Sequence, residues 1–264
     1  MLNALEGADL LIDLAWASWI YTAPFSQLLD GGVTILSSMA GVDTCLKMKP
    51  DLRFANRART GGRALDRAVR IHVTSAAGTD LVMSKEGRAG HYRDGLLRDE
   101  GEIWDNFPAC HCTCAPVEDS AEGRLVINPG DILLTLRHIV ETPIVCDIEE
   151  GRIRQITGGA DAALLAAWLR RWQDGGSYVM AHIGFGCDDR AEVAAMQLME
   201  WEALSGGVMI AFGSNASRFL GGQNRAVSHL DVVLRQADFS VDDETIIREG
   251  QFVRPDFMLG GGGV

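Results

Sequence analysis

The chain has 264 residues, of which 47% are hydrophobic and 23% charged, enough for one large domain or two small ones. Its formal net charge of −12 argues against a surface that binds nucleic acid or an anionic membrane.

The first 25 residues are largely apolar but lack a basic leader. Three acidic residues interrupt them, Glu6, Asp9 and Asp13. A signal peptide is therefore not expected. Since no run of about 18 uncharged apolar residues follows, neither is a transmembrane helix. We expect a cytoplasmic protein.

The N-terminal part predicts a small α/β unit. Residues 8–16 and 31–41 have the composition of strands, and a short helix is expected between them at about 24–29. A helix from residue 42 is expected to run into a connection, and a second, short helix to turn into a strand at Ile71, with a break between them near 58–63. We place a domain boundary there, with a small N-terminal α/β domain at 1–60 and a larger, β-rich domain at 61–264.

The rest of the chain predicts short strands with two helices, so the fold class is α/β (α+β). Hairpins are expected where Pro-Gly, Glu-Gly and Asp-Asp turn signals interrupt β-rich runs, at 123–134, 142–159 and 237–253. The helices are expected at 161–172, with Asp161 as N-cap, and at 189–207. The glycine-rich tail 260–264 is expected to be disordered.

The stretch "FPACHCTC" (107–114) resembles a zinc knuckle in composition, but strand geometry opposes that interpretation. In a strand, Cys110, Cys112 and Cys114 share one face and His111 points to the other. The thiols cannot chelate a metal together with His111, and at about 7 Å spacing they do not easily close on one zinc ion. We interpret these three as buried apolar thiols, and all six cysteines of the chain as free thiols in a reducing compartment.

The strongest chemical signal is "SHLDVVLRQ". In a strand, His229 and Asp231 point to the same face and offer two cis ligands for a divalent metal; the alternative is a polar surface. His182 in "SYVMAHIGFG" is the best third ligand, although it can also be a core histidine. Two histidines and one carboxylate leave open positions on a non-haem Fe(II) ion.

The remaining histidines, His72, His91 and His138, have no supporting arrangement in the sequence. His91 lies in a glycine-rich segment that could reach a site as a loop.

Four segments occur in an order that resembles the 2,5-dihydroxypyridine 5,6-dioxygenases of nicotinate degradation, which are related to the M29 metallo-aminopeptidases. They are "NFPACHCTCAPVEDSAEGRLVI", "IEEGRIRQITGG", "AHIGFG" and "GGQNRAVSHLDVVLRQADFSVDDETIIREG". The likeness covers roughly residues 100–253. It implies a mononuclear Fe(2+) site on His182, His229 and Asp231, with Ser214 also at the metal and His111 as the catalytic base.

The peptidases hold two metals through several carboxylates. Here His111 and His182 stand at two of those glutamate positions, and Arg218 falls near a third ligand, so a second metal is not expected. The dioxygenases also carry a histidine near the substrate in an "HSPE"-like segment. This chain has "YTAP", with Tyr21 or Thr22 in its place, and the sequence therefore does not specify the ring substituents.

The resemblance implies cleavage of a hydroxylated N-heteroaromatic ring by O2, giving an N-formyl amide acid. The expected partners are a small aromatic substrate and O2, within a homo-oligomer that the resemblance makes a hexamer. Two alternatives stay open: an M29-like metallohydrolase or aminopeptidase using Zn²⁺ or Co²⁺, and a non-catalytic assembly protein with a structural His-x-Asp pair.

Overall fold

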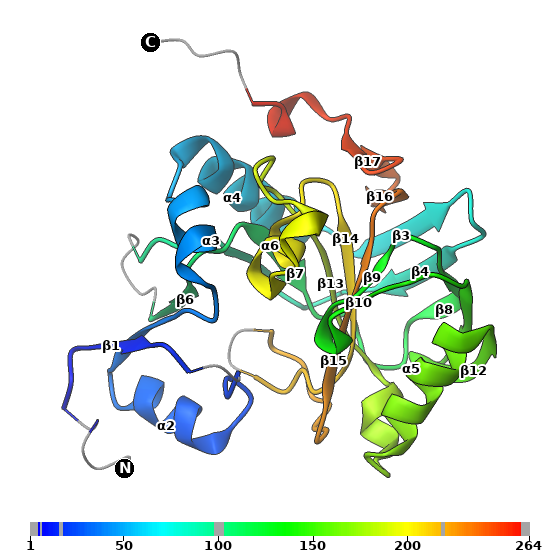
Figure 1. Ribbon diagram of the computed structural model, residues 1–264, viewed down its shortest axis with the longest axis horizontal. Helices are drawn as coiled ribbons and strands as arrows, with labels where there is room; N and C mark the ends of the chain where they lie inside the picture. Colours follow the sequence, from blue (N-terminus) through cyan, green and yellow to red (C-terminus); the bar gives the residue numbers. More distant parts are fainter. Residues whose placement is uncertain (1–4, 6, 16–17, 98–102, 218–219, 260–264) are drawn as a thin grey trace.

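The computed structural model describes residues 5, 7–15, 18–97, 103–217 and 220–259 (Figure 1). Helices and strands are mixed along the chain, and the strands form sheets of three, seven and eight members. The predicted α/β class is confirmed. Arg218 and the tail 260–264 lie outside the described residues.

The N-terminal unit is built around a small parallel sheet, seen at the lower left of Figure 1. Its strands are β1 (Leu10–Asp13), β2 (Thr34–Ser37) and β6 (Trp104–Asn106). Helix α2 (Ala23–Asp30) buries Phe25, Leu28 and Leu29 in the same apolar cluster as Ile35 and Trp104. The two predicted strands and the helix between them are therefore present. The domain division at residue 60 stays a prediction.

Two helices follow, α3 (Val42–Lys47) and α4 (Leu52–Arg67). The expected break between two helices at 58–63 is wrong, because these residues lie within the single helix α4. Gly61 and Gly62 do not break the helix; they let it approach the strands beneath. A Cβ added at Gly61 would lie 2.4 Å from the Cys112 sulfur.

The two large sheets contain the remaining strands. In spatial order, the seven-stranded sheet contains β10 (His138–Ile139), β9 (Ile132–Leu133), β15 (His229–Leu234), β14 (Val208–Gly213), β13 (Met180–Gly186), β7 (His111–Cys114) and β5 (Gly90–Arg93). The eight-stranded sheet contains β12 (Arg152–Gly158), β11 (Ile144–Glu149), β8 (Glu122–Ile127), β4 (Asp80–Ser84), β3 (Arg70–Ser75), β16 (Ala237–Val241), β17 (Glu244–Arg248) and β18 (Gln251–Phe252).

Both large sheets contribute to one hydrophobic core. Ile71 and Leu125 of the eight-stranded sheet belong to the same buried cluster as Cys112, Phe185 and Val232 of the seven-stranded sheet. The cysteines of the 107–114 stretch are free and buried, so their interpretation as core thiols agrees with the structure. The opposite face of the seven-stranded sheet is therefore available for other side chains.

Two of the three predicted hairpins are present, β11–β12 and β16–β17. The third, at 123–134, is wrong: β8 and β9 belong to different sheets, and the Pro129–Gly130 turn carries the chain from one to the other. A Pro-Gly signal predicts a turn, but it does not show whether the turn closes a hairpin or joins strands of two different sheets.

Both predicted helices need correction. Helix α5 (Ala160–Arg170) has Gly159, not Asp161, as its N-cap; the Asp161 carboxylate instead accepts from the backbone N–H groups of Glu141 and Thr142. The expected helix at 189–207 consists of a 3₁₀ turn (Val193–Ala195) and α6 (Leu198–Ala203). Met196 separates them with a left-handed φ of 52°.

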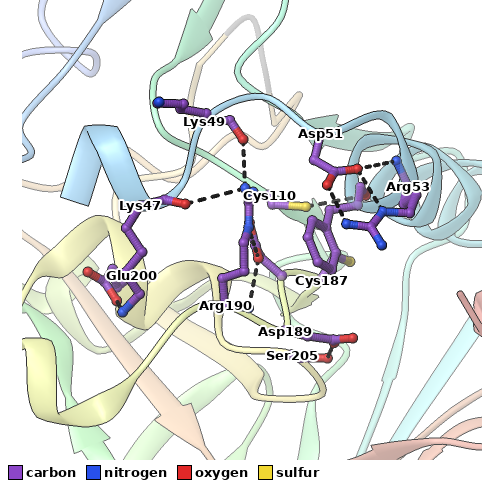
Figure 2. A network of polar contacts seen from close by, with 12 residues as sticks. Lys47, Lys49, Asp51, Arg53, Cys110, Cys187, Asp189, Arg190, Glu200 and Ser205 are labelled. Atoms are coloured by element: carbon purple, nitrogen blue, oxygen red, sulfur yellow. Dashed lines mark hydrogen bonds and ion pairs between the residues drawn. The ribbon is translucent and has the colours of Figure 1, made fainter. Parts of the chain in front are cut away.

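A polar network fixes the segment that leads to α6 (Figure 2). Arg190 donates to the backbone carbonyl of Lys49 at 2.8 Å and pairs with Asp188 at 2.7 Å. Lys47 pairs with the buried Glu200 of α6 at 2.7 Å. These contacts hold α6 against α3 and thus fix which of its side chains point to the sheet.

Among the described residues, no helix combines the length and the apolar character needed to span a bilayer.

We expect Gly61→Ala to destabilise the protein by about 1–3 kcal/mol, because the new methyl group overlaps the Cys112 sulfur. Cys112→Ala should recover much of that loss in the double variant, since it removes the overlapping atom. Urea unfolding of both single variants and the double variant measures the coupling. Gly175→Ala is the matched control, because a Cβ there meets no heavy atom within 4 Å. Strictly additive effects would contradict the packing described.

Candidate metal centre

Three of the side chains singled out by the sequence lie on one face of the seven-stranded sheet. His182 on β13 is in register with Ala211 on β14, and Ala211 is in register with Asp231 on β15. His229 lies two residues before Asp231 on the same strand, and therefore on the same face. The small Ala211 side chain leaves the space between His182 and Asp231 open.

A β-bulge turns His182 to this face. Within the described strands, Ala181 is the extra residue of β13 between the pairs Met180–Phe212 and His182–Ala211. Met180 points into the core, so strict alternation would also turn His182 into the core. The buried Asn215 donates from Nδ2 to the carbonyl of Ala181 at 3.1 Å, which stabilises the bulge.

The donor atoms of the three side chains converge. His182 Nε2 lies 3.2 Å from His229 Nε2, and Asp231 Oδ1 lies 3.1 Å from the first nitrogen and 3.3 Å from the second. Two cis ligands with bonds of about 2.1 Å to one ion are themselves about 3.0 Å apart. The three atoms therefore have the spacing of ligands around a single metal ion.

Neighbouring groups orient the ligands. His229 Nδ1 donates to the carbonyl of Ser214 at 2.9 Å, so that Nε2 faces the other two side chains. The backbone N–H of Asp231 donates to Thr135 Oγ1 at 2.9 Å. Ser214 thus orients the His229 ring through its backbone carbonyl; a role of its hydroxyl at a metal stays a prediction.

The electrostatics match a site that attracts cations. Burial alone would raise the pKa of Asp231, but the two histidines hold it well below its usual value. Burial disfavours charge on His229, yet the Asp231 carboxylate outweighs this and raises the pKa of the ring. Burial lowers the pKa of His182.

His111 lies on the same face, opposite the cysteines of its own strand. It is in register with Gly186 on one side and with Arg93 on the other. Burial and the charge of Arg93 lower the pKa of His111 to about 3, so the ring is neutral at neutral pH. Its Nδ1 is buried and has no hydrogen-bond partner among the described residues.

Sequence reasoning left Tyr21 undecided and missed Glu202. The Tyr21 hydroxyl lies 3.4 Å from His229 Nε2, with the two ring centroids 4.7 Å apart, whereas the Thr22 hydroxyl donates to the carbonyl of Trp19. Glu202 on α6 lies 3.9 Å from His111 Nδ1. Burial, then the charge of Asp231, raises the pKa of Glu202 to about 8. The sequence did not single out Glu202, because an acidic residue within an expected helix does not by itself indicate a functional site.

The other histidines lie in different surroundings. His72 pairs with Asp80, and His138 pairs with Asp161. His91 is not in a loop as expected but in β5, where burial lowers its pKa to about 4.

The residues present fit one metal ion. In the part of the chain that the structure describes, His182, His229 and Asp231 form the group of three His, Cys, Asp or Glu side chains that can share an ion. Imidazole nitrogen and carboxylate oxygen suit Fe(II) and other first-row divalent ions.

Comparison with known proteins agrees with this geometry. Residues 1–254 match the family described as NicX, 2,5-dihydroxypyridine 5,6-dioxygenase. A 2,5-dihydroxypyridine 5,6-dioxygenase of Pseudomonas putida is 31% identical over 262 residues, which are 96% of this chain and 73% of that protein.

Two solved structures are similar. One is the 2,5-dihydroxypyridine dioxygenase of Pseudomonas putida KT2440, with a TM-score of 0.90 and 30% identity over 97% of this chain and 75% of the other. AmpT of Thermus thermophilus has a TM-score of 0.64 at 15% identity, over 96% of this chain and 78% of the other, and shares the fold alone.

We expect the metal-stripped protein to bind one Zn(II) or Co(II) ion and to release protons on binding. The Asp231 carboxylate raises the pKa of His229 and so favours its protonated form, with which a metal ion must compete, so affinity should fall as the pH is lowered. Calorimetry in buffers of different ionisation enthalpy measures the release. Asp231→Ala should abolish binding with the fold retained, and Cys112→Ala should leave it unchanged. Binding that survives loss of Asp231, or disappears with Cys112, would contradict the site.

Proposed function

The chain belongs to the 2,5-dihydroxypyridine 5,6-dioxygenase (NicX) family, and from this premise we propose that it is a non-haem Fe(II)-dependent ring-cleaving dioxygenase. The proposed substrate is a hydroxylated N-heteroaromatic such as 2,5-dihydroxypyridine, and the product an N-formyl amide acid. The observation that carries the proposal is the convergence of His182, His229 and Asp231, with donor atoms 3.1–3.3 Å apart on one sheet face.

These three residues would hold the iron, with Ser214 beside it. A bound Fe(II) ion would supply activation of O2 and open positions next to the ring. The protein places the Tyr21 ring against His229, and Tyr21 keeps its own proton because burial raises the pKa of its hydroxyl well above the usual value.

His111 would accept the proton of the ring hydroxyl. Its ring is neutral because burial lowers its pKa, and a neutral imidazole has one nitrogen free to take a proton. Removing the proton raises the electron density of the ring and prepares it for attack by oxygen.

Hydrolysis is the less well supported alternative. An M29-like peptidase reaction would use a second metal, and the described residues offer one group of three ligands. His111 and His182 occupy positions at which the resemblance implies glutamates in the peptidases. The cytoplasmic location and the homo-oligomer stay predictions.

Protein purified without oxygen and loaded with Fe(II) should consume O2 when 2,5-dihydroxypyridine is added, with loss of the ring absorbance. Asp231→Ala should consume none, because it lacks a ligand. An oxygen electrode and absorbance spectroscopy make the measurement. Peptide hydrolysis with Zn(II) or Co(II) and no O2 uptake would favour the hydrolase, and a protein that neither binds metal nor turns over substrate would favour the assembly protein.

His111→Ala should keep its iron and lose about 10²–10⁴-fold in rate, the usual contribution of a general base. Raising the pH should partly restore the variant, because more of the substrate hydroxyl is then already ionised. Metal analysis and pH–rate profiles of both proteins test this. Loss of iron would make His111 a ligand, and unimpaired turnover would make it structural.

A further inference from the structure

Glu202 has no role in the reaction as described, yet its side chain is largely buried at the metal centre. Its side chain is 20% exposed, and its carboxylate interacts electrostatically with Tyr21, His229 and Asp231. Among the described residues, His111 is the basic group within ion-pair distance of it, with Nδ1 at 3.9 Å from Oε2. A buried carboxylate without a hydrogen-bond donor is costly, so one kept at this position calls for an explanation.

The residue that faces Glu202 lacks a partner as well. His111 Nδ1 is buried and makes no hydrogen bond within the described part of the chain. Nδ1 of a neutral imidazole can donate, and a carboxylate can accept. The 3.9 Å separation exceeds hydrogen-bond length by about 1 Å, so the bond requires a side-chain rotation that shortens it.

The fold holds these two groups opposite each other. Trp201 packs with Met209 and Val233 on the site face of the sheet, which anchors α6 there. Gly186, the register partner of His111, lets the backbone after α6 come close: a Cβ at Gly186 would lie 2.3 Å from the Leu204 carbonyl oxygen. The Lys47–Glu200 pair fixes α6 from its other side (Figure 2).

We propose that Glu202 is a positioning residue for His111: its carboxylate accepts a hydrogen bond from Nδ1 and leaves Nε2 as the nitrogen that takes the substrate proton. The partner of one ring nitrogen sets which nitrogen carries the proton in a neutral histidine. The proposal rests on the proposed function, in which His111 is the base.

The test reads the tautomer of His111 by ¹⁵N NMR in Zn(II)-loaded protein, with the signal assigned from its absence in His111→Ala. Burial, and after it the charge of Asp231, raises the pKa of Glu202 to about 8, so the spectra are recorded at about pH 9, where the carboxylate is ionised. A divalent cation on Asp231 removes the second cause. Wild type should carry the proton on Nδ1, and Glu202→Gln should keep it there because the amide oxygen still accepts. In Glu202→Ala the proton should move to Nε2.

Activity gives the second readout. Glu202→Ala should lose up to about 100-fold in kcat with KM and metal content unchanged, since Glu202 orients the base without binding substrate. Glu192→Gln is the matched control, because its side chain is 67% exposed and belongs to the same segment. An unchanged tautomer in Glu202→Ala overturns the proposal, as does loss of Zn(II) from that variant.

Failure of the proposed function gives a different result. If wild type binds no Zn(II), the metal claim fails, and the tautomer comparison is made on metal-free protein at about pH 9, where Glu202 is ionised. If the Fe(II)-loaded protein does not cleave 2,5-dihydroxypyridine but the tautomer of His111 still depends on Glu202, the proposed reaction is wrong and the positioning role of Glu202 is retained.

Discussion

A carboxylate buried beside two imidazoles is the constraint on which the site depends. Asp231 is 9% exposed in the middle of a sheet, and an isolated charge there would be prohibitively unstable. His182 and His229 compensate it with contacts of 3.1 and 3.3 Å. The same arrangement suits a cation, because a divalent ion could take the place of the proton through which the imidazoles compensate the Asp231 carboxylate.

The two faces of the seven-stranded sheet have different surroundings: one packs in the hydrophobic core, and the other carries the candidate metal centre. On β7, Cys112 and Cys114 pack in the core, while His111 turns to the site. Small thiols suit the core side because α4 lies directly against it, with Gly61 next to Cys112. The cysteines of "FPACHCTC" thus belong to the close-packed core face, and His111 belongs to the face that carries the candidate metal centre.

Strand periodicity was enough to predict the His229–Asp231 pair and the opposite orientation of His111 and the cysteines. It could not predict the orientation of His182, because a bulge at Ala181 shifts the alternation and depends on Asn215, which is 34 residues away in the sequence. Glu202 was missed because Met196 interrupts the expected helix and changes which side chains of 189–207 face the sheet. Tyr21 reaches the site from 208 residues away, and Pro129–Gly130 joins two sheets; both are tertiary outcomes that local patterns do not specify.

The central claim is that this sheet face supports oxygen insertion and not hydrolysis. Mass spectrometry of the product formed by Fe(II)-loaded protein from 2,5-dihydroxypyridine under isotopically labelled O2 tests it most directly. We expect a ring-opened product that carries two labelled oxygen atoms. A product that takes its new oxygen from water alone would contradict it.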